Sequence, residues 1–256
     1  MEGISVIIPC YNKLELTRNC INSLEQTSGD DVEFIIMDNG STDNTADTLK
    51  TLRGRFRYRR NQENIGLVRA FNQGASEARY ETIVFMHNDV IIHDRDWPDR
   101  IRNFLNSRED AGVAGLYGAR KIRKDASFMG RGIVHSKLEG GNLLRDHIEV
   151  AVVDGLFMAM KKKIYEEIGM FDECYTVHYY DKDISLRSYV NGYRNYVLNI
   201  PFTHIGAGTR SSVKTETDNE VRDKMKGIFI EKWGAHLPLD VRTKGERIRD
   251  WIKRYV

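Results

Sequence analysis

Short apolar segments alternate with amphipathic ones over the first hundred residues of the chain. The runs ISVIIP and EFIIMD are continuous and rich in β-branched residues, which is typical of strands buried on both faces. Segments with apolar positions at helical spacing follow each of them. Strands that alternate with helices of this length predict βαβ units, and therefore a parallel sheet with right-handed crossovers. We expect strands at residues 4–9, 33–38, 56–60 and 82–87, and helices at residues 13–26, 44–52 and 67–78.

The second half of the chain has a less regular pattern. Strand-like segments are FMGRGIVHS, VAVVDGLFMAMKKK and NYVLNIP, and helical ones are KKIYEEIGMF and DISLRSYVNGY, with Gly192 suited to end the latter. From Glu216 the pattern is helical to the end. The expected fold class is α/β, with a Rossmann-type, mainly parallel sheet flanked by helices. We expect one domain over residues 1–208 and a helical extension over residues 209–256 that packs on it.

Composition and charge exclude several classes of protein. The 256 residues include 39 basic and 37 acidic ones, a net charge of +2 that indicates no nucleic-acid partner. Three cysteines without CxxC spacing argue against a disulfide framework or a structural zinc site, and they fit a reducing compartment. The apolar run near the N-terminus is too short for a signal peptide, and no run approaches the ~20 apolar residues of a membrane span. These features predict a cytoplasmic protein.

Polar residues follow three of the expected strands. They are Tyr11-Asn12 after the first strand, Asp38-Asn39 after the second and His87-Asn88-Asp89 after the fourth. Ligands of such sheets bind outside the carboxyl ends of the strands, so we expect these side chains to lie along one edge of the sheet. Structural roles are open as well. Asn12 can cap the next helix, and Asp89 can cap a turn or pair with an arginine.

A further group of polar residues gathers near the start of the helix expected at residues 67–78. Its members are Asn64, Gly66, Arg69 and Asn72. An asparagine and a glycine before a helix suit a simple capped turn. The free N–H groups of a helix N-terminus also attract phosphate, and an arginine would add positive charge. The pattern fits either role.

Two acidic residues and one histidine complete the candidates for chemistry. Asp181 and Asp183 precede an expected helix, where an acid can cap the helix or act as a general base. His204 follows a strand, where a histidine is either structural or a metal ligand.

These segments resemble, in the same order, the family 2 glycosyltransferases, which are inverting enzymes of the GT-A fold. The similarity covers about residues 3–208. No single motif is specific, but seven in register make a specific combination. They are SVIIPCYN, FIIMDNGSTDNT, NQENIGLVRAFNQGASEA, TIVFMHND, VDGLFMAMKKKIYEEIGMFDE, YYDKDISLRSYVNGY and THIGAGT.

The resemblance implies a nucleotide-sugar donor, most often a UDP-sugar, and a divalent cation such as Mn²⁺ or Mg²⁺. It implies transfer with inversion to a glycan, a lipid-linked or a protein acceptor. The residues that it implies on the nucleotide side are Pro9, Tyr11, Asn12, Asp38, Asn64, Gly66, Arg69, Asn72, His87 and Asn88.

The same resemblance assigns the metal and acceptor sides. Asp89 binds the metal, together with His204, and Asp181 is the general base. Asp154 and Gly155 face the acceptor, and Asp183 and Arg187 support that side.

One position departs from the family pattern. His87 stands where the family has the first acid of its DxD segment. Losing this negative charge lowers the metal affinity or shifts the preference toward a metal that accepts imidazole.

Other functions and contacts remain open. A catalytically degenerate protein that binds nucleotide or glycan without turnover would tolerate His87. A nucleotidyltransferase needs a glycine-rich phosphate loop, which the segment PCYNKLEL lacks. Near the C-terminus, apolar residues lie among lysines and arginines, which suits a helix that packs on the domain, a dimer contact, or peripheral contact with the inner membrane face. These apolar residues are Trp233, Ile248, Trp251, Ile252 and Tyr255.

Overall fold

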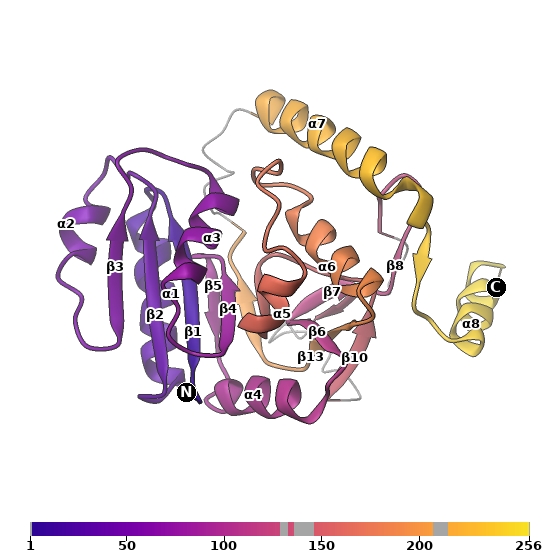
Figure 1. The fold of residues 1–256 in the computed structure, drawn as a ribbon, viewed down its shortest axis with the longest axis horizontal. Helices are drawn as coiled ribbons and strands as arrows, with labels where there is room; N and C mark the ends of the chain where they lie inside the picture. Colours follow the sequence, from indigo (N-terminus) through magenta and orange to yellow (C-terminus); the bar gives the residue numbers. More distant parts are fainter. Residues whose placement is uncertain (1, 129–132, 136–145, 207–214, 256) are drawn as a thin grey trace.

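The computed structural model describes residues 2–128, 133–135, 146–206 and 215–255. Within these residues, the centre is an eight-stranded sheet in the order β10-β13-β6-β12-β4-β1-β2-β3 (Figure 1). Its strands are β1 (Ile4–Cys10), β2 (Val32–Asp38), β3 (Phe56–Arg60), β4 (Thr82–Met86), β6 (Ala111–Gly115), β10 (His147–Val150), β12 (Phe157–Lys161) and β13 (Arg194–Leu198). The helices that pack around it are α1 (Leu14–Thr27), α2 (Thr45–Leu49), α3 (Leu67–Ser76), α4 (Trp97–Ser107), α5 (Lys162–Glu167) and α6 (Tyr180–Val190).

Shorter strands and the C-terminal elements lie around this sheet. The short strands are β5 (Val90–Ile92), β7 (Tyr117–Ala119), β8 (Lys121–Ile122), β9 (Ile133–His135), β11 (Val152–Val153) and β14 (Phe202–His204). The C-terminal elements are α7 (Thr215–Trp233), the 3₁₀ helix η2 (Gly234–His236), β15 (Leu239–Asp240) and α8 (Lys244–Tyr255). In Figure 1, α7 runs along one edge of the molecule and α8 lies at its far end.

The sheet has a parallel part and an inserted antiparallel strand. Strands β3, β2, β1 and β4 are mutually parallel, so the predicted βαβ units and the α/β fold class are confirmed. Strand β12 is antiparallel to both of its neighbours, β4 and β6. Cys10 pairs with Asp38 in the last register position of β1 and β2. The carboxyl ends of β1, β2 and β4 therefore lie at the same edge of the sheet.

The sheet is buried on both faces, which explains the continuous apolar runs. In β1 successive side chains point to opposite faces, as the strand period requires. Ile7 belongs to the core under α3, whereas Val6 and Ile8 belong to the core under α1 and α4. All seven residues of β1 and of β2 are buried. One apolar run thus supplies two hydrophobic cores.

Three local predictions are wrong. Asn12 does not cap α1, because its side-chain oxygen accepts hydrogen bonds from the Thr42 and Asp43 N–H groups of the next loop. Neither acid is the N-cap residue of α6, which is Tyr179, although Asp181 accepts a first-turn N–H, that of Lys182. The C-terminal segment is also not helical throughout, since β15 interrupts it and pairs antiparallel with β8.

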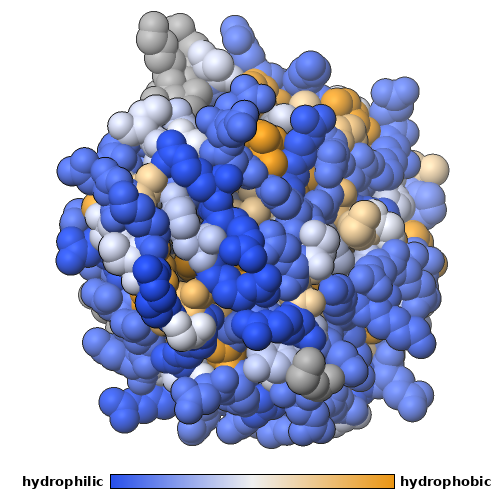
Figure 2. Space-filling model, turned by 60° about the vertical axis from the view of Figure 1, so that its left-hand side comes forward, coloured by the Kyte–Doolittle hydropathy of each residue, from blue (hydrophilic) through white to orange (hydrophobic). Residues whose placement is uncertain are grey.

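One face of the molecule is largely polar. Figure 2 shows the face over α2 and β3 as mainly hydrophilic, with hydrophobic residues visible only in scattered places. No helix within the described residues is long and apolar enough to cross a membrane. The predicted boundary at residue 208 stays a prediction.

A buried ionic cluster joins α7 to the sheet domain. The Asp183 carboxylate is fully buried and accepts hydrogen bonds from Arg187 in α6 and from the Trp233 indole in α7. The Lys232 ammonium lies 2.8 Å from Asp183 Oδ1, the same oxygen that accepts the hydrogen bond from Trp233. One carboxylate thus holds two helices together.

We expect Asp183→Asn to lower the free energy of unfolding by about 3 kcal/mol, because it leaves Arg187 and Lys232 close together without their shared counter-charge. Urea denaturation monitored by circular dichroism measures the change. The control is Asp47→Asn, which removes an exposed ion pair with Lys50 and should leave the midpoint unchanged. Equal midpoints for both variants would contradict the structural role of Asp183.

Candidate functional site

A cleft of about 700 Å³ opens at the carboxyl ends of β1 and β4. Its described lining comes from strand tips, from the start of α3, from the loop before α6 and from α7. The lining residues are Pro9, Cys10, Tyr11, Asn39, Asn64, Gly66, Leu67, His87, Asn88, Asp89, Asp154, Thr176, Val177, His204, Gly206, Asp218 and Val221. The structure thus brings together nine of the residues that the sequence singled out, namely Pro9, Tyr11, Asn64, Gly66, His87, Asn88, Asp89, Asp154 and His204.

The turn after β4 carries the most concentrated chemistry of the cleft. His87 donates its backbone N–H to the Leu156 carbonyl, which continues the ladder between β4 and β12. The Asn88 amide donates to the Thr17 hydroxyl at 2.9 Å inside the protein. These bonds fix the turn and explain why a buried strand can end on polar residues.

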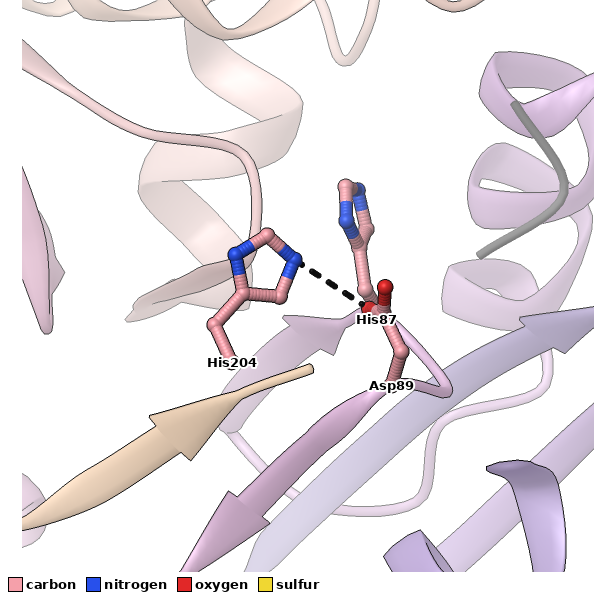
Figure 3. Close-up of side chains that lie close together, drawn as sticks. All are labelled: His87, Asp89 and His204. Carbon is pink, nitrogen blue, oxygen red and sulfur yellow. Dashed lines mark ion pairs between the residues drawn. The ribbon is translucent and has the colours of Figure 1, made fainter. Parts of the chain in front are cut away.

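Three side chains in this part of the cleft form a group that could hold a metal ion. One ligand atom from each of His87, Asp89 and His204 lies within 4.8 Å of the other two. Figure 3 shows His204 and Asp89 facing each other with the His87 ring beside them, and His204 Nε2 lies 3.4 Å from Asp89 Oδ1. Pairing of β14 with β5 sets His204 opposite Val90 and brings it next to Asp89.

The donor set discriminates between cations. Two imidazoles and one carboxylate suit a first-row transition metal, whereas Mg²⁺ favours oxygen ligands in an octahedral arrangement. The group therefore fits a transition-metal ion better than Mg²⁺.

A second group of candidate residues is a pair of neighbouring carboxyl groups, Asp154 and Asp181. Asp154 follows β11, and its Oδ1 accepts the Leu156 N–H at 3.1 Å. Asp181 in the first turn of α6 accepts the Lys182 N–H at 2.9 Å and the Gly155 N–H at 3.3 Å. Asp154 lines the cleft, whereas Asp181 is not among the described residues that do so.

Burial raises the pKa of both carboxyl groups. Burial, followed by the negative charge of Asp181, raises the pKa of Asp154 to about 6. Burial also raises the pKa of Asp181, while the positive charge of Lys182 opposes this. Carboxyl groups with raised pKa values in a cleft are candidates for proton transfer near neutral pH.

Asp38 has a different environment from the one that the sequence suggested. Its carboxylate is fully buried and does not belong to the described lining of the cleft. One oxygen accepts the Ser41 N–H at 2.8 Å, and the other accepts the Tyr58 hydroxyl at 2.6 Å and lies 3.3 Å from Arg60. Contact with a base or ribose would require Asp38 to exchange one of these partners.

Several other predicted site residues serve the protein's own structure. Asn12 joins two loops, as described above. Asn72 donates to the Phe171 carbonyl and to Glu173, while Arg69 is exposed and pairs with Glu173 at 3.3 Å. These two residues of α3 therefore bind a neighbouring loop and not the described cleft wall.

Asp183 and Arg187 lie away from the described cleft wall as well. The carboxylate of Asp183 has no exposed surface, and Arg187 binds it and the Ile168 carbonyl. This placement disagrees with direct contact between these two residues and an acceptor. It agrees with a role in which they support the α6 segment.

Sequence reasoning missed the lining that comes from the loop before α6 and from α7. Thr176, Val177, Asp218 and Val221 carry no motif, and only the tertiary structure brings them to the cleft. His178 Nε2 lies 2.9 Å from Asp218 Oδ1 and ties the two segments together.

Tyr180 was also missed, although it adjoins Asp181 in the sequence. Its hydroxyl lies 2.8 Å from His87 Nε2 and donates to the Gly155 carbonyl at 3.2 Å. Tyr180 thus connects His87 of the candidate metal group with Gly155, the residue after Asp154.

Comparison with curated proteins finds relatives of this chain. Two curated relatives are named poly-beta-1,6-N-acetyl-D-glucosamine synthase. The one from Staphylococcus aureus (strain COL) is 28% identical over 201 residues, which cover 76% of this chain and 47% of the relative. The one from Staphylococcus epidermidis is 26% identical over 178 residues, which cover 67% and 42%. The chain thus spans about half the length of these relatives or less.

Two solved structures share the fold at low sequence identity. GalNAc-T7 with UDP, GalNAc and Mn²⁺ superimposes with a TM-score of 0.65 and 13% identity, over 79% of this chain and 43% of that one. Mannosyltransferase PcManGT from Pyrobaculum calidifontis, in complex with GDP-Man and Mn²⁺, gives a TM-score of 0.56 and 17% identity over 77% and 56%. These similarities confirm the expected GT-A-like fold.

A match to a family model identifies the family to which this chain belongs. Residues 5–169 match the model named glycosyl transferase family 2, and this range is well over half of the 256 residues. It includes β1, β2, α3 and the His87–Asp89 turn. The chain therefore belongs to glycosyl transferase family 2.

Proposed function

We propose that this protein transfers a sugar from a nucleotide-sugar, namely a UDP-sugar, to an acceptor hydroxyl with inversion at the anomeric carbon. The observation that carries the proposal is a cleft lined by His87, Asp89 and His204 together with the raised-pKa carboxyl of Asp154, which neighbours Asp181. Such a cleft offers one group for a cation beside a charged leaving group and another group for proton removal.

The family and the structural relatives support the donor class. The structures of GalNAc-T7 and of S. aureus TarS 1–349 contain UDP, whereas that of the mannosyltransferase contains GDP-Man. A nucleoside would lie along Pro9, Tyr11, Asn64 and Gly66. Its diphosphate would lie toward the turn at Asp89.

His87, Asp89 and His204 would hold the divalent cation, with Mn²⁺ preferred. When bound, this cation neutralises the negative charge that develops on the departing diphosphate. The turn at Asn88 keeps Asp89 in place through the bond to Thr17.

Asp181 would act as the general base. It takes the proton from the acceptor hydroxyl, the oxygen attacks the anomeric carbon, and the bond between that carbon and the phosphate oxygen breaks on the opposite side. The electron pair of that bond leaves with the nucleoside diphosphate. Asp154 places a second carboxyl group beside the base and would face the acceptor.

The alternative is a degenerate protein that binds nucleotide or glycan without turnover. His87 in place of an acid is its sequence support. This alternative requires nucleotide binding without release of UDP from any UDP-sugar.

Titration calorimetry with UDP and GDP, each with Mn²⁺, with Mg²⁺ and without metal, tests the donor and the cation. We expect UDP to bind more tightly than GDP, and at least tenfold more tightly with Mn²⁺ than without metal, because a cation held by Asp89 would offset the negative charge of the diphosphate. The variant Asp89→Asn should lose most of this metal effect, and Asp94→Asn, on the loop beyond β5, is its control. Equal affinity with and without Mn²⁺ would contradict the metal role.

The base is tested by UDP release from UDP-sugars, with water or an added sugar as the acceptor. Asp181→Asn should reduce kcat by at least a hundredfold and leave UDP affinity unchanged. In the wild type, kcat/KM should fall as the pH drops through about 6, because protonation of the carboxyl pair removes the base. Asp154→Asn removes one negative charge, so the pKa of Asp181 should fall and the acid limb should move to lower pH. Loss of turnover in Asp154→Asn together with wild-type turnover in Asp181→Asn would transfer the base role to Asp154.

Peripheral membrane contact through the basic C-terminus is a separate proposal. Ile248 and Trp251 of α8 are 58% and 62% exposed among lysines and arginines. We expect sedimentation with phosphatidylserine vesicles at low salt and at least a fivefold loss of binding in the double variant Ile248→Ser, Trp251→Ser. Absence of wild-type binding at low salt would rule this contact out.

A further inference from the structure

Tyr180 connects two parts of the cleft that are far apart in the sequence. It is the first residue of α6 and is 3% exposed. Its hydroxyl lies 2.8 Å from His87 Nε2 and 3.2 Å from the Gly155 carbonyl oxygen. The hydroxyl thus contacts His87 of the candidate metal group and Gly155 of the segment before β12.

One arrangement of hydrogens satisfies both contacts. A phenol hydroxyl has one hydrogen to donate, and a carbonyl oxygen can only accept. The hydroxyl of Tyr180 therefore donates to Gly155 and accepts from His87, whose hydrogen is then on Nε2. A neutral imidazole with its hydrogen on Nε2 has its lone pair on Nδ1, where a metal can bind.

The surrounding rings hold this arrangement in place. The Tyr180 ring packs against Phe171, with centroids 5.4 Å apart, and against Phe71 at 6.1 Å. The His87 ring lies nearly parallel to Phe71, with an interplanar angle of 13°. Both rings that share the hydrogen bond therefore rest on one aromatic side chain of α3.

Gly155 is required for the same contact. A Cβ atom at this position would lie 2.0 Å from the Tyr180 hydroxyl oxygen, so any side chain would displace the hydroxyl or the loop. The Gly155 N–H points to Asp181 at 3.3 Å, while its carbonyl accepts from Tyr180. Two consecutive residues of α6 thus hold Gly155 by its N–H and by its carbonyl.

We propose that Tyr180 is a positioning residue that fixes His87 as the Nε2–H tautomer, so that Nδ1 is the nitrogen presented to the metal. The inference rests on the metal role in the proposed function. A partner that fixes the tautomer and orientation of a metal-binding histidine typically changes metal affinity by 10- to 100-fold. Through Gly155 the same hydroxyl links the metal side of the cleft to the segment of Asp181.

The tautomer is measured directly by long-range ¹H–¹⁵N correlation NMR on the metal-free protein labelled at its seven histidines. His87→Gln identifies the His87 signals. We expect the wild type to show hydrogen on Nε2 and Tyr180→Phe to show a mixture of both tautomers. In the control Tyr196→Phe, the lost hydroxyl donates to Asp110, and the Tyr196 ring belongs to the hydrophobic core under α1 and α4 and not to the core that contains Tyr180. This variant should leave the His87 signals unchanged. Hydrogen on Nδ1 of wild-type His87 would overturn the inference.

Metal affinity is measured by electron paramagnetic resonance of free Mn²⁺ in the presence of saturating UDP. Tyr180→Phe should weaken Mn²⁺ binding at least tenfold, Gly155→Ala should weaken it in the same direction, and Tyr196→Phe should match the wild type. Unchanged Mn²⁺ affinity in Tyr180→Phe, with normal binding by the wild type, contradicts this inference alone. Absence of Mn²⁺ binding by the wild type contradicts the metal role in the proposed function and overturns this inference with it.

Discussion

The parallel alignment of β1, β2 and β4 is the constraint on which the rest of the structure depends. It places the carboxyl ends of three strands at one edge, where their following residues form the floor of a cleft. Both faces of these strands are covered by hydrophobic cores, so the strands themselves have no freedom to accept polar ligands. The candidate residues that this sheet supplies are therefore mainly those that follow its strands.

The second half of the chain completes this edge from the other direction. Strand β12 runs antiparallel beside β4, so the segment before it, with Asp154 and Gly155, meets the end of β4 at His87. Helix α6 then begins at Tyr180 and binds this segment through both of its first two residues. The antiparallel strand β12 thus brings the segment of Asp154 and Gly155, which Asp181 contacts, next to the turn at His87.

Polar side chains at this edge divide into two groups according to their partners. Asp38, Asn12 and Asn72 have their oxygens occupied by N–H and hydroxyl groups of neighbouring loops, and they fix the shape of the cleft. Asp89 and His204 face each other across the cleft floor. Asp38 and Asp89 therefore have different surroundings, although both follow a buried strand.

The sequence alone determined the α/β class, the parallel strands of the first half and the turn at residues 87–89, because apolar periodicity and strand tips are local properties. The family resemblance further identified His204 and the Asp154 and Asp181 segments, and the structure brings these together with the turn. Only the tertiary structure decided that Asp38 is buried away from the described cleft wall, that Asp183 anchors α7, and that Tyr180 joins His87 to Gly155. Each of these depends on hydrogen bonds between residues 20 to 93 positions apart, whose partners no local pattern identifies. The same holds for the lining from α7, which reaches the cleft through packing on α6.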